Sequence, residues 1–294
     1  MLLRRSGWLR SRLRRRPANV SGKPCIGLAL GGGFARGIAH VGILRVLERE
    51  RAPLHCVSGV SAGAIVAAAF AGGATSEEIG RVGSAMRFAH VARWSICRLG
   101  LVGSERMTKF LGRLLKHLRF EDMKIPLGVV ATDIQKGAPV YFRGEGDVAL
   151  AIRASCSYPG LFRPVQHNGR ILVDGAMSVE VPALLARNMG ATHVISVCIP
   201  APQDDCHPHN MFEVVNRCFQ IMMQRNEESW RRYSDAVISP RVENIPWDGF
   251  VNAARMIEEG ERAAEQIVPE LRRWLSDRWK TGDSASRLLI ADRA

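Results

Sequence analysis

The chain has 294 residues, of which 47% are hydrophobic and 23% charged, enough for a sizeable buried core in one large or two small domains. Its net charge of +13 is unevenly placed, because residues 1–20 hold seven arginines and no acid. The remaining residues hold 34 Lys and Arg against 28 Asp and Glu, so the body of the chain is only mildly basic. No segment reaches the roughly 18 apolar residues of a membrane span.

The arginine-rich first 20 residues also contain apolar side chains, namely Leu2, Leu3, Trp8, Leu9 and Leu13. This mixture suits an anionic membrane surface better than a duplex groove, so peripheral membrane contact is one interpretation and no nucleic-acid partner is expected. A disordered leader, an over-extended reading frame and an organelle transit peptide are the alternatives. A secretory signal is excluded because a continuous apolar region is missing.

The seven cysteines are odd in number, show no CxxC spacing and lie mostly in apolar runs. They are Cys25, Cys56, Cys97, Cys156, Cys198, Cys206 and Cys218. This usage is typical of reduced, buried thiols. A cytoplasmic protein is therefore predicted, with peripheral contact at the inner membrane face if the basic tail binds lipid.

In chain order, the opening alternates between short apolar runs and helical patterns. Residues 25–30 form an apolar run that enters three glycines, and residues 38–51 follow with helical periodicity. A second apolar run at 56–60 leads to an Ala-rich helix at 64–71. This order predicts a parallel sheet with helices on its faces.

The rest of the chain also contains both predicted helices and predicted strands. A capped helix begins at residues 75–78 and an amphipathic stretch spans 104–117. The apolar side chains between them (Trp94, Ile96, Leu99, Leu101 and Val102) belong either to a lid or to the core. Further strands are predicted at 127–131, 140–142, 171–173, 193–199 and 236–239. Further helices are predicted at 184–190, 212–233 and 250–274, the last interrupted by Pro269.

The pentapeptide Gly59-Val60-Ser61-Ala62-Gly63 matches the pattern G-x-S-x-G. Strand-like residues precede it and the Ala-rich helix follows, which is the context of a nucleophile on a sharp strand-to-helix turn. The helix N-terminus there favours developing negative charge. Ser61 is therefore the candidate nucleophile.

A glycine-rich loop precedes this pentapeptide, Gly31-Gly32-Gly33-Phe34-Ala35-Arg36-Gly37. Amides freed by glycines at a helix start bind a phosphate or the oxyanion of an acyl-transfer intermediate. A Rossmann turn is disfavoured because Arg36 stands at the sixth position and an acid about 20 residues on is missing. A P-loop is disfavoured because no Gly-Lys-Ser/Thr follows. An oxyanion loop accounts for both motifs together.

Asp174, with Gly175 after it, ends the apolar run 171–173. Active sites of open α/β sheets lie beyond the carboxyl ends of the strands, so Asp174 is expected near Ser61, where it accepts the serine proton. An ordinary Asp, with a pKa of about 3.9, is a poor base for a hydroxyl. The alternative is an Asp-Gly turn without a chemical role.

These three motifs, G-G-G-F-A-R-G, G-V-S-A-G and D-G-A, resemble in order and spacing the patatin-like phospholipase family. The resemblance covers roughly residues 24–245 and includes residues 131–133, 153–155, 159–165 and 169–176. Two residues, Phe34 and Ala35, separate the third glycine from the basic residue, where the plant-type loop has one, so the loop resembles the bacterial branch.

The resemblance implies a three-layer α/β/α sandwich with a mostly parallel central sheet and a Ser61–Asp174 dyad. It implies an oxyanion hole from the loop Gly31, Gly32, Gly33 and Phe34, and ester hydrolysis through an acyl-enzyme without metal or cofactor. The expected organisation is an arginine-rich tail at 1–20, a catalytic domain at 21–245 and a helical extension at 246–294 packed on it. The expected substrate is a phospholipid or another acyl ester.

Several alternatives stay open. Arg36 and Arg153 are candidates for contact with a phospholipid head group, or for a buried ion pair. His207 and His209 are the histidines placed to complete a Ser-Asp-His triad, and Cys206–His209 with Asp204 and Asp205 form either a metal site or a polar loop. The chain as a whole is alternatively a weakly active lipid-binding regulator, or an acyltransferase that uses the same dyad. Head group, acyl position, chain length and oligomeric state are left undetermined.

Overall fold

The computed structural model describes residues 24–91, 93–97, 100–103, 105–201 and 210–276. The predictions for the tail at 1–20, for the triad histidines and for the metal loop at 204–209 fall outside these residues. Residues 24–276 belong to one compact unit. The boundaries predicted after residues 20 and 245 stay predictions.

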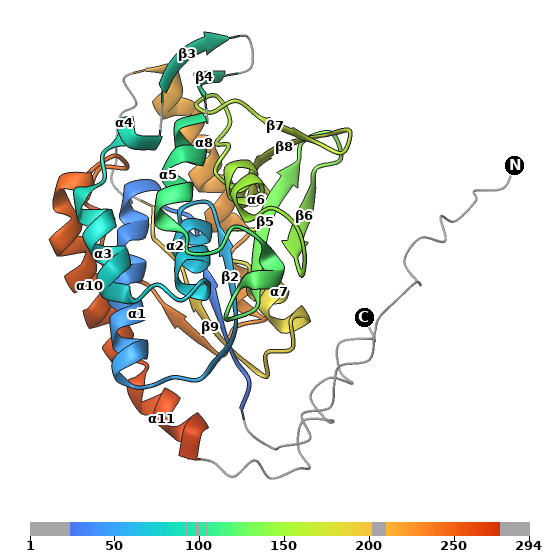
Figure 1. The fold of residues 1–294 in the computed structure, drawn as a ribbon. Helices are drawn as coiled ribbons and strands as arrows, with labels where there is room; N and C mark the ends of the chain where they lie inside the picture. The colour runs from blue at the N-terminus through green and yellow to red at the C-terminus, as the bar shows by residue number, and fades with distance from the viewer. Residues whose placement is uncertain (1–23, 92, 98–99, 104, 202–209, 277–294) are drawn as a thin grey trace, which may run out of the picture. The chain divides into compact units, whose positions relative to one another are not determined.

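A central eight-stranded sheet organises the described chain (Figure 1). Its order is β10-β9-β1-β2-β5-β8-β7, and β6 also pairs with β5. The strands are β1 (Ile26–Leu30), β2 (Leu54–Val60), β5 (Leu127–Asp133), β6 (Ala138–Arg143), β7 (Val165–His167), β8 (Arg170–Asp174), β9 (His193–Val197) and β10 (Ala236–Ile238). The neighbours from β10 to β5 run parallel, whereas β6, β7 and β8 pair antiparallel. The predicted mostly parallel sheet is confirmed.

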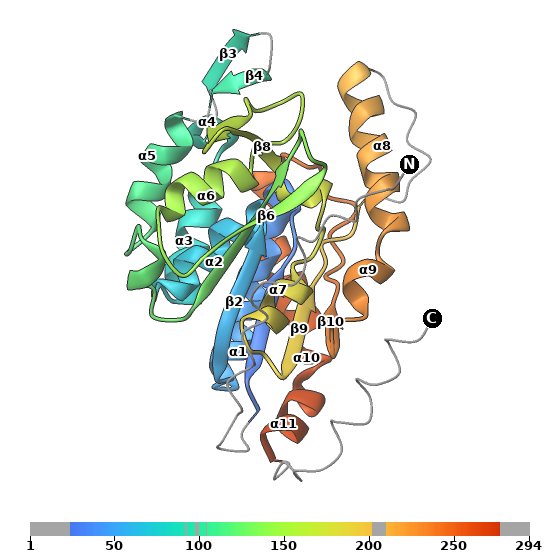
Figure 2. The ribbon, with the colours of Figure 1, turned by 90° about the vertical axis from the view of Figure 1, so that its right-hand side faces the viewer.

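Helices cover both faces of the sheet (Figures 1 and 2). The first half contributes η1 (Phe34–Ile38), α1 (Ala39–Arg49), α2 (Ala62–Ala71), α3 (Ser76–Ala85), α4 (Phe88–Val91), α5 (Glu105–Leu114), η2 (Phe120–Asp122) and α6 (Val148–Ser155). The second half contributes η3 (Gly175–Met177), α7 (Ala183–Asn188), α8 (Met211–Arg225), α9 (Glu228–Arg231), η4 (Phe250–Asn252), α10 (Ala253–Glu265) and α11 (Val268–Ser276). The α/β/α layering is as predicted.

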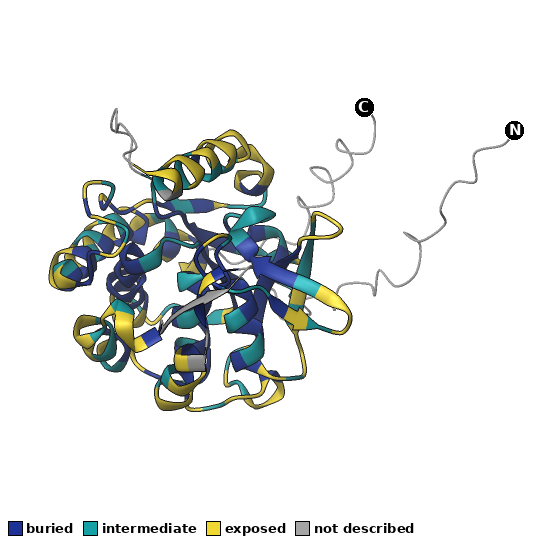
Figure 3. Cartoon of the chain, turned by 90° about the horizontal axis from the view of Figure 1, so that it is seen from above, coloured by how far each residue is buried: buried dark blue, intermediate teal, exposed yellow. Residues whose placement is uncertain are grey.

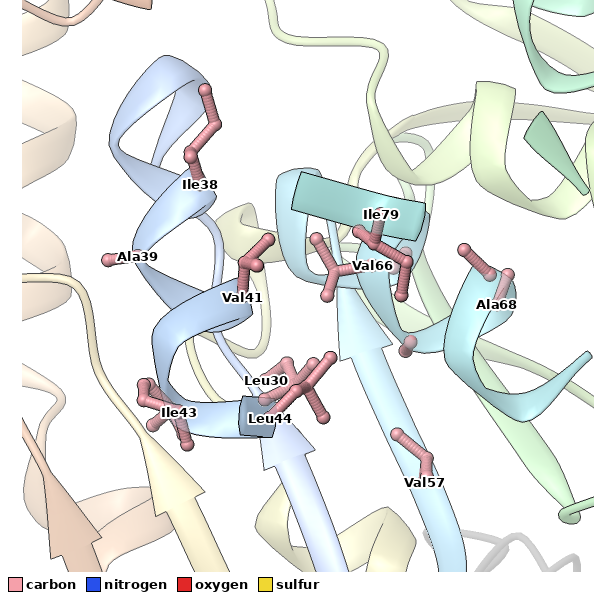
Figure 4. Close-up of a cluster of buried hydrophobic side chains, with 14 of the residues drawn as sticks. Leu30, Ile38, Ala39, Val41, Ile43, Leu44, Val57, Val66, Ala68 and Ile79 are labelled. Carbon is pink, nitrogen blue, oxygen red and sulfur yellow. The ribbon is translucent and has the colours of Figure 1, made fainter. Parts of the chain in front are cut away.

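The continuous apolar run of β1 is explained by burial on both faces. Leu28 and Leu30 point to the larger hydrophobic cluster, where Figure 4 shows Leu30 beside Leu44 of α1. Ala29 points the other way, to a second cluster that includes Ala183 of α7. A strand covered on both sides has no polar face, so its sequence does not alternate.

The described part of the C-terminal extension packs on the main domain through small residues. Gly42 of α1 and Gly260 of α10 face the opposite helix so closely that a Cβ at either position would overlap a backbone carbonyl. Arg45 of α1 also pairs with Glu261 of α10 across this contact at 2.8 Å. The close approach explains why two glycines stand inside helices, where they are otherwise destabilising.

Three local features differ from the sequence predictions. The helix predicted at 212–233 is two helices, because the chain breaks at Asn226 and Glu227 and turns Trp230 of α9 into the second cluster. The apolar connector at 94–102 contains a two-stranded antiparallel sheet, β3 (Arg93–Cys97) and β4 (Gly100–Gly103). Strand β7 was not expected from the sequence.

Burial is highest in the sheet and at the inner sides of the helices, and exposed residues follow the outer sides (Figure 3). Among helices built from described residues, none has the length and apolar character that crossing a bilayer requires. Of the five cysteines whose side chains are described, Cys56, Cys156 and Cys198 are buried, as the sequence indicated. Cys218 is exposed on α8, which corrects the expectation for that residue.

Candidate active site

Ser61 lies between β2 and α2, at the sharp turn that the pentapeptide predicts. Its backbone has φ 52° and ψ −125°, a conformation that residues with a side chain seldom adopt. The flanking glycines make the turn feasible: a Cβ at Gly59 would lie 2.6 Å from the Ala64 Cα, and one at Gly63 would overlap the Leu30 carbonyl. The chain therefore holds a strained serine at the N-terminus of a helix.

Two side chains hold Ser61 in place. The Ser61 hydroxyl donates a 2.7 Å hydrogen bond to Oδ2 of Asp174. The Ser61 amide donates a 2.8 Å hydrogen bond to the hydroxyl of Ser155, which is fully buried at the end of α6. Ser155 was part of the resembling stretch at 153–155, but the sequence did not indicate this role.

Asp174 is held by its own network. Its Oδ1 accepts the amide of Ala176 at 2.9 Å, and its backbone carbonyl accepts the Thr132 hydroxyl at 2.9 Å. Gly175 packs so tightly that a Cβ there would overlap the Val130 carbonyl. The carboxylate thus has a fixed orientation with one oxygen directed at Ser61.

The Asp174 carboxyl is 1% exposed, and this burial raises its pKa to about 7 because the charged form loses its hydration. The hydrogen bonds from Ala176 and Ser61 oppose the shift, since both stabilise the carboxylate. A carboxyl group with a pKa near neutrality is a much stronger base than an ordinary aspartate. The objection that an ordinary Asp is too weak a base is therefore removed by its surroundings.

The reason given from the sequence for the position of Asp174 needs correction, because β8 is not a parallel strand. It pairs antiparallel with β5, with Asp174 opposite Ala131, while Val60 of β2 pairs with Val130 of β5. Asp174 is therefore one register step beyond Val60, level with Ser61. The reversal comes from the tight turn at Asn168 and Gly169, whose φ angles of 48° and 72° are typical of a two-residue hairpin.

The glycine loop lies against the nucleophile. A Cβ at Gly32 would be 3.3 Å from the Ser61 Cβ, so the loop backbone passes directly over the serine. The Gly31 amide donates to the Val197 carbonyl at 2.9 Å and is engaged in the sheet. Among the described hydrogen bonds, none uses the amides of Gly32, Gly33 or Phe34. These three groups are the ones free to bind an oxyanion.

The glycine loop is anchored by His40 of α1, which contacts its first residue. His40 is completely buried, and its Nε2 lies 2.9 Å from the Gly31 carbonyl. Burial lowers the pKa of His40 to about 4, so the ring is neutral at pH 7 and donates from Nε2. The backbone on one side of the oxyanion loop is thus fixed by a side chain of α1.

Arg36 is 5% exposed, and its Nη1 donates to the Pro200 carbonyl at 3.1 Å. Burial lowers its pKa from the usual value, although the Glu243 carboxylate opposes the shift. Gly37, the last residue of the motif, faces Ala62 at a distance that leaves no room for a Cβ. Arg153, the second head-group candidate, is half-buried on α6.

Ser61 and Phe34 line two cavities of opposite character. The polar cavity has a volume of about 470 Å³ and is lined by residues that include Arg36, Asp174, Glu180, Asn216 and Gln220. The apolar cavity has about 100 Å³ and is lined by residues that include Ile38, Ile65, Val82, Phe110 and Phe162. Arg153 is among the lining residues of neither cavity.

His193 begins β9, at the end of the strand away from Ser61. No group of three His, Cys, Asp or Glu side chains that is arranged to hold a metal ion occurs within the described ranges.

Comparison with known proteins agrees with this geometry. The family model for patatin-like phospholipase matches residues 28–187. An uncharacterized NTE family protein of Mycobacterium tuberculosis is 30% identical, over 67% of this chain and 56% of its own length. Lysophospholipase NTE1 of Mycosarcoma maydis is 28% identical, over 86% of this chain and 13% of its own length. The chain therefore spans about half, or much less, of the curated relatives that it matches.

A solved structure, VipD from Legionella pneumophila, aligns with a TM-score of 0.58 and 15% identity over 85% of this chain and 67% of that one. At this identity the likeness concerns the fold. The matched range includes the glycine loop, Ser61 and Asp174. The chain belongs to the patatin-like phospholipase family.

Proposed function

We propose that this chain is a serine hydrolase of lipid acyl esters, a carboxylic ester hydrolase that uses Ser61 and Asp174 as a dyad. One observation carries the proposal: the Ser61 hydroxyl donates a 2.7 Å hydrogen bond to a buried carboxyl group whose pKa is raised to about 7. A hydroxyl paired with such a base is an activated nucleophile.

In the proposed reaction, the Ser61 oxygen bonds to the ester carbonyl carbon while its proton passes to Asp174. The amides of Gly32, Gly33 and Phe34 stabilise the negative oxygen of the tetrahedral intermediate. The bond to the leaving alcohol then breaks, and Asp174 returns the proton to the leaving oxygen. Water attacks the acyl-enzyme by the same steps in reverse, which releases the fatty acid and restores Ser61.

The two cavities suggest how a lipid is oriented. The acyl chain enters the apolar cavity, whereas the glycerol and head group occupy the polar cavity, where Arg36 is the head-group candidate. The family, together with relatives named lysophospholipase, supports a phospholipid or lysophospholipid as the substrate. We further propose a cytoplasmic enzyme that meets its substrate at the membrane surface.

The test is hydrolysis of a short p-nitrophenyl ester, a phospholipid and a lysophospholipid by the full chain. Ser61→Ala and Asp174→Asn are each expected to remove more than about 99% of the activity, because each removes half of the dyad. Ser58→Ala is the matched control, because Ser58 lies on the same strand but donates to the Pro182 carbonyl at 3.0 Å. Wild-type activity in both dyad variants would refute the mechanism.

Two further measurements separate the alternatives. Labelling of Ser61 by a fluorophosphonate probe is expected in the wild type, whereas a lipid-binding regulator without activity gives none. Product analysis with added alcohol acceptors distinguishes an acyltransferase, which forms new esters, from a hydrolase, which forms free acid. For the tail, vesicle binding that is unchanged on removal of residues 1–20 would exclude a membrane anchor there.

A further inference from the structure

Helix α8 carries an unusual concentration of exposed apolar side chains. The described residues contain eleven large hydrophobic side chains that are exposed, and five of them lie on this one helix of 15 residues. They are Met211, Val214, Val215, Ile221 and Met222, with exposed fractions between 39% and 82%. Their spacing, together with that of the exposed Cys218, places them on one side of the helix.

The opposite side of α8 is mainly polar and faces the polar cavity, although Met223 also lines that cavity and Phe219 packs on Tyr158. Asn216, Arg217, Gln220 and Gln224 line the polar cavity together with Ser61. Asn216 also accepts a 2.7 Å hydrogen bond from the Tyr158 hydroxyl, which fixes the orientation of the helix. The most exposed apolar side chains of α8 therefore lie on its outer side, whereas an ordinary surface helix turns its apolar side toward the protein.

The position of α8 makes the apolar side accessible. Figure 2 shows α8 at the edge of the molecule, with α9 below it. The apolar side measures about 17 Å by 10 Å, since it runs from Met211 to Met222 and a helix rises about 1.5 Å per residue. This area is far below the roughly 800 Å² that each partner buries in a stable protein complex. A second copy of the chain or another protein is therefore a poor match for this surface alone.

The charges beside the apolar side favour a lipid surface that is anionic. Arg225 closes α8, and Arg231 and Arg232 follow on and after α9; all three are exposed. Glu227 is half-buried and pairs with Arg231 at 2.6 Å, and the exposed Glu228 adds a second acid, so the three arginines exceed the acids of this segment by one charge. Apolar side chains flanked by arginines are the pattern of helices that lie in the headgroup region of a membrane.

We infer that the outer side of α8, formed by Met211, Val214, Val215, Cys218, Ile221 and Met222, docks on an anionic phospholipid surface. Docking places the cavity that holds Ser61 about one helix diameter, roughly 10 Å, from the lipid. The membrane contact itself does not depend on the proposed lipid hydrolysis. Only its use in supplying substrate rests on that proposed function. The basic tail is not required for it.

The experiment measures cosedimentation of the full-length chain with vesicles of phosphatidylglycerol and phosphatidylcholine, or of phosphatidylcholine alone. The test variant combines Met211→Ser, Val215→Ser and Met222→Ser, none of which lines a cavity. The matched control combines Leu118→Ser, Ile134→Ser and Val251→Ser, three exposed apolar residues elsewhere. All variants keep the same residues 1–20, so a difference in vesicle binding between them is caused by the substitutions and not by the tail.

The α8 variant is expected to bind anionic vesicles about tenfold more weakly than the wild type, because three inserted apolar side chains are lost. The control variant should bind like the wild type, and the wild type should prefer anionic vesicles. Equal binding of the α8 variant and the wild type would overturn the inference. So would a wild-type dimer in sedimentation equilibrium that the α8 variant converts to monomer, because the surface would then be a contact between copies.

Repeating the vesicle measurement with Ser61→Ala separates this inference from the proposed function. Full binding by this variant is expected, because docking does not use the nucleophile. A soluble p-nitrophenyl ester should be hydrolysed equally by the wild type and the α8 variant, whereas hydrolysis of vesicle lipid should fall with binding. If no enzyme form hydrolyses any ester but the vesicle results hold, the proposed function fails and the docking surface stands.

Discussion

The buried hydroxyl of Ser155 accepts the backbone amide of Ser61 at 2.8 Å, although the two residues are 94 positions apart. This contact supports the strained turn that carries the nucleophile. Ser155→Ala leaves a buried amide unsatisfied, which should lower the free energy of unfolding by about 1–3 kcal/mol and reduce kcat by about tenfold or more. Chemical denaturation and ester kinetics measure the two effects. Ser157→Ala, whose hydroxyl donates to the Arg153 carbonyl, is the control, and an equal loss of kcat there would contradict the role.

The pH dependence of activity should follow Asp174. The proposed mechanism needs the ionised carboxylate, and burial raises its pKa to about 7, so kcat/KM should rise with pH through about 7 and then level off. Initial rates with a p-nitrophenyl ester between about pH 5 and pH 9 measure this profile. A profile that is already level at pH 5, as an aspartate with an ordinary pKa of about 3.9 would give, would show that the proton acceptor is not this buried group.

Gly32→Ala should abolish activity without unfolding the protein. The added Cβ would lie 3.3 Å from the Ser61 Cβ and 3.9 Å from its Oγ, in the space where the carbonyl carbon must approach. A drop of more than about 100-fold in kcat/KM is expected, the scale of losing oxyanion stabilisation. Gly112→Ala, where a Cβ meets nothing within 4 Å, should keep near wild-type activity. Retained activity in Gly32→Ala would exclude this loop from the reaction.

The apolar cavity should determine acyl chain length. Gly83 lines this cavity from α3, and Gly83→Leu places a side chain inside it. Hydrolysis of long-chain p-nitrophenyl esters should fall about tenfold or more relative to the acetate, since displaced methylenes each lose about 0.8 kcal/mol of burial. Gly112→Leu is the control, because a Cβ there meets nothing within 4 Å. An unchanged ratio of long-chain to short-chain rates would place the acyl chain elsewhere.

His40 should make the fold sensitive to acid. Burial lowers its pKa to about 4 from 6.5, so below pH 6.5 the unfolded chain takes up a proton that the folded chain refuses. The stability contributed by this neutral histidine is present above pH 6.5 and is lost as the pH falls toward 4, by at most about 3 kcal/mol. Asp174 acts in the opposite direction, because its pKa is raised and its charging destabilises the fold as the pH rises toward 7.

The contribution of His40 is measured as the difference in unfolding free energy between the wild type and His40→Gln at several pH values. As the pH falls from 6.5 to 4, the unfolding free energy of the wild type should decrease relative to that of His40→Gln. The exposed His55, replaced by glutamine, serves as the comparison. A difference that does not vary with pH would show that His40 carries its proton equally in both states.

Much of the site could be read from local patterns. The G-x-S-x-G pentapeptide and the glycine loop are recognisable as local patterns, because their glycines stand together where one backbone segment must approach another closely. Gly63 against Leu30 and Gly32 against Ser61 are examples. The continuous apolar run of β1 likewise reports burial on both faces, a property of the strand itself.

The prediction that Asp174 lies beside Ser61 was reached from an incorrect assumption about strand direction. The rule used for its position assumes a parallel strand, whereas β8 is antiparallel and reaches the site through its register with β5. The Asn168-Gly169 pair was a usable hairpin signal that was overlooked. Register, in contrast, depends on the pairing of distant strands, which local periodicity does not encode.

By itself, the sequence predicted the strained serine turn, the glycine loop beside it and the α/β layering, because each leaves a pattern among residues that are neighbours along the chain. Only the tertiary structure decided three other features: the pKa of Asp174, the support of Ser61 by Ser155, and the orientation of α8. Burial and hydrogen bonds across 94 or 113 positions depend on how separate elements pack. An amphipathic pattern shows that a helix has two sides, but packing decides which side meets the protein.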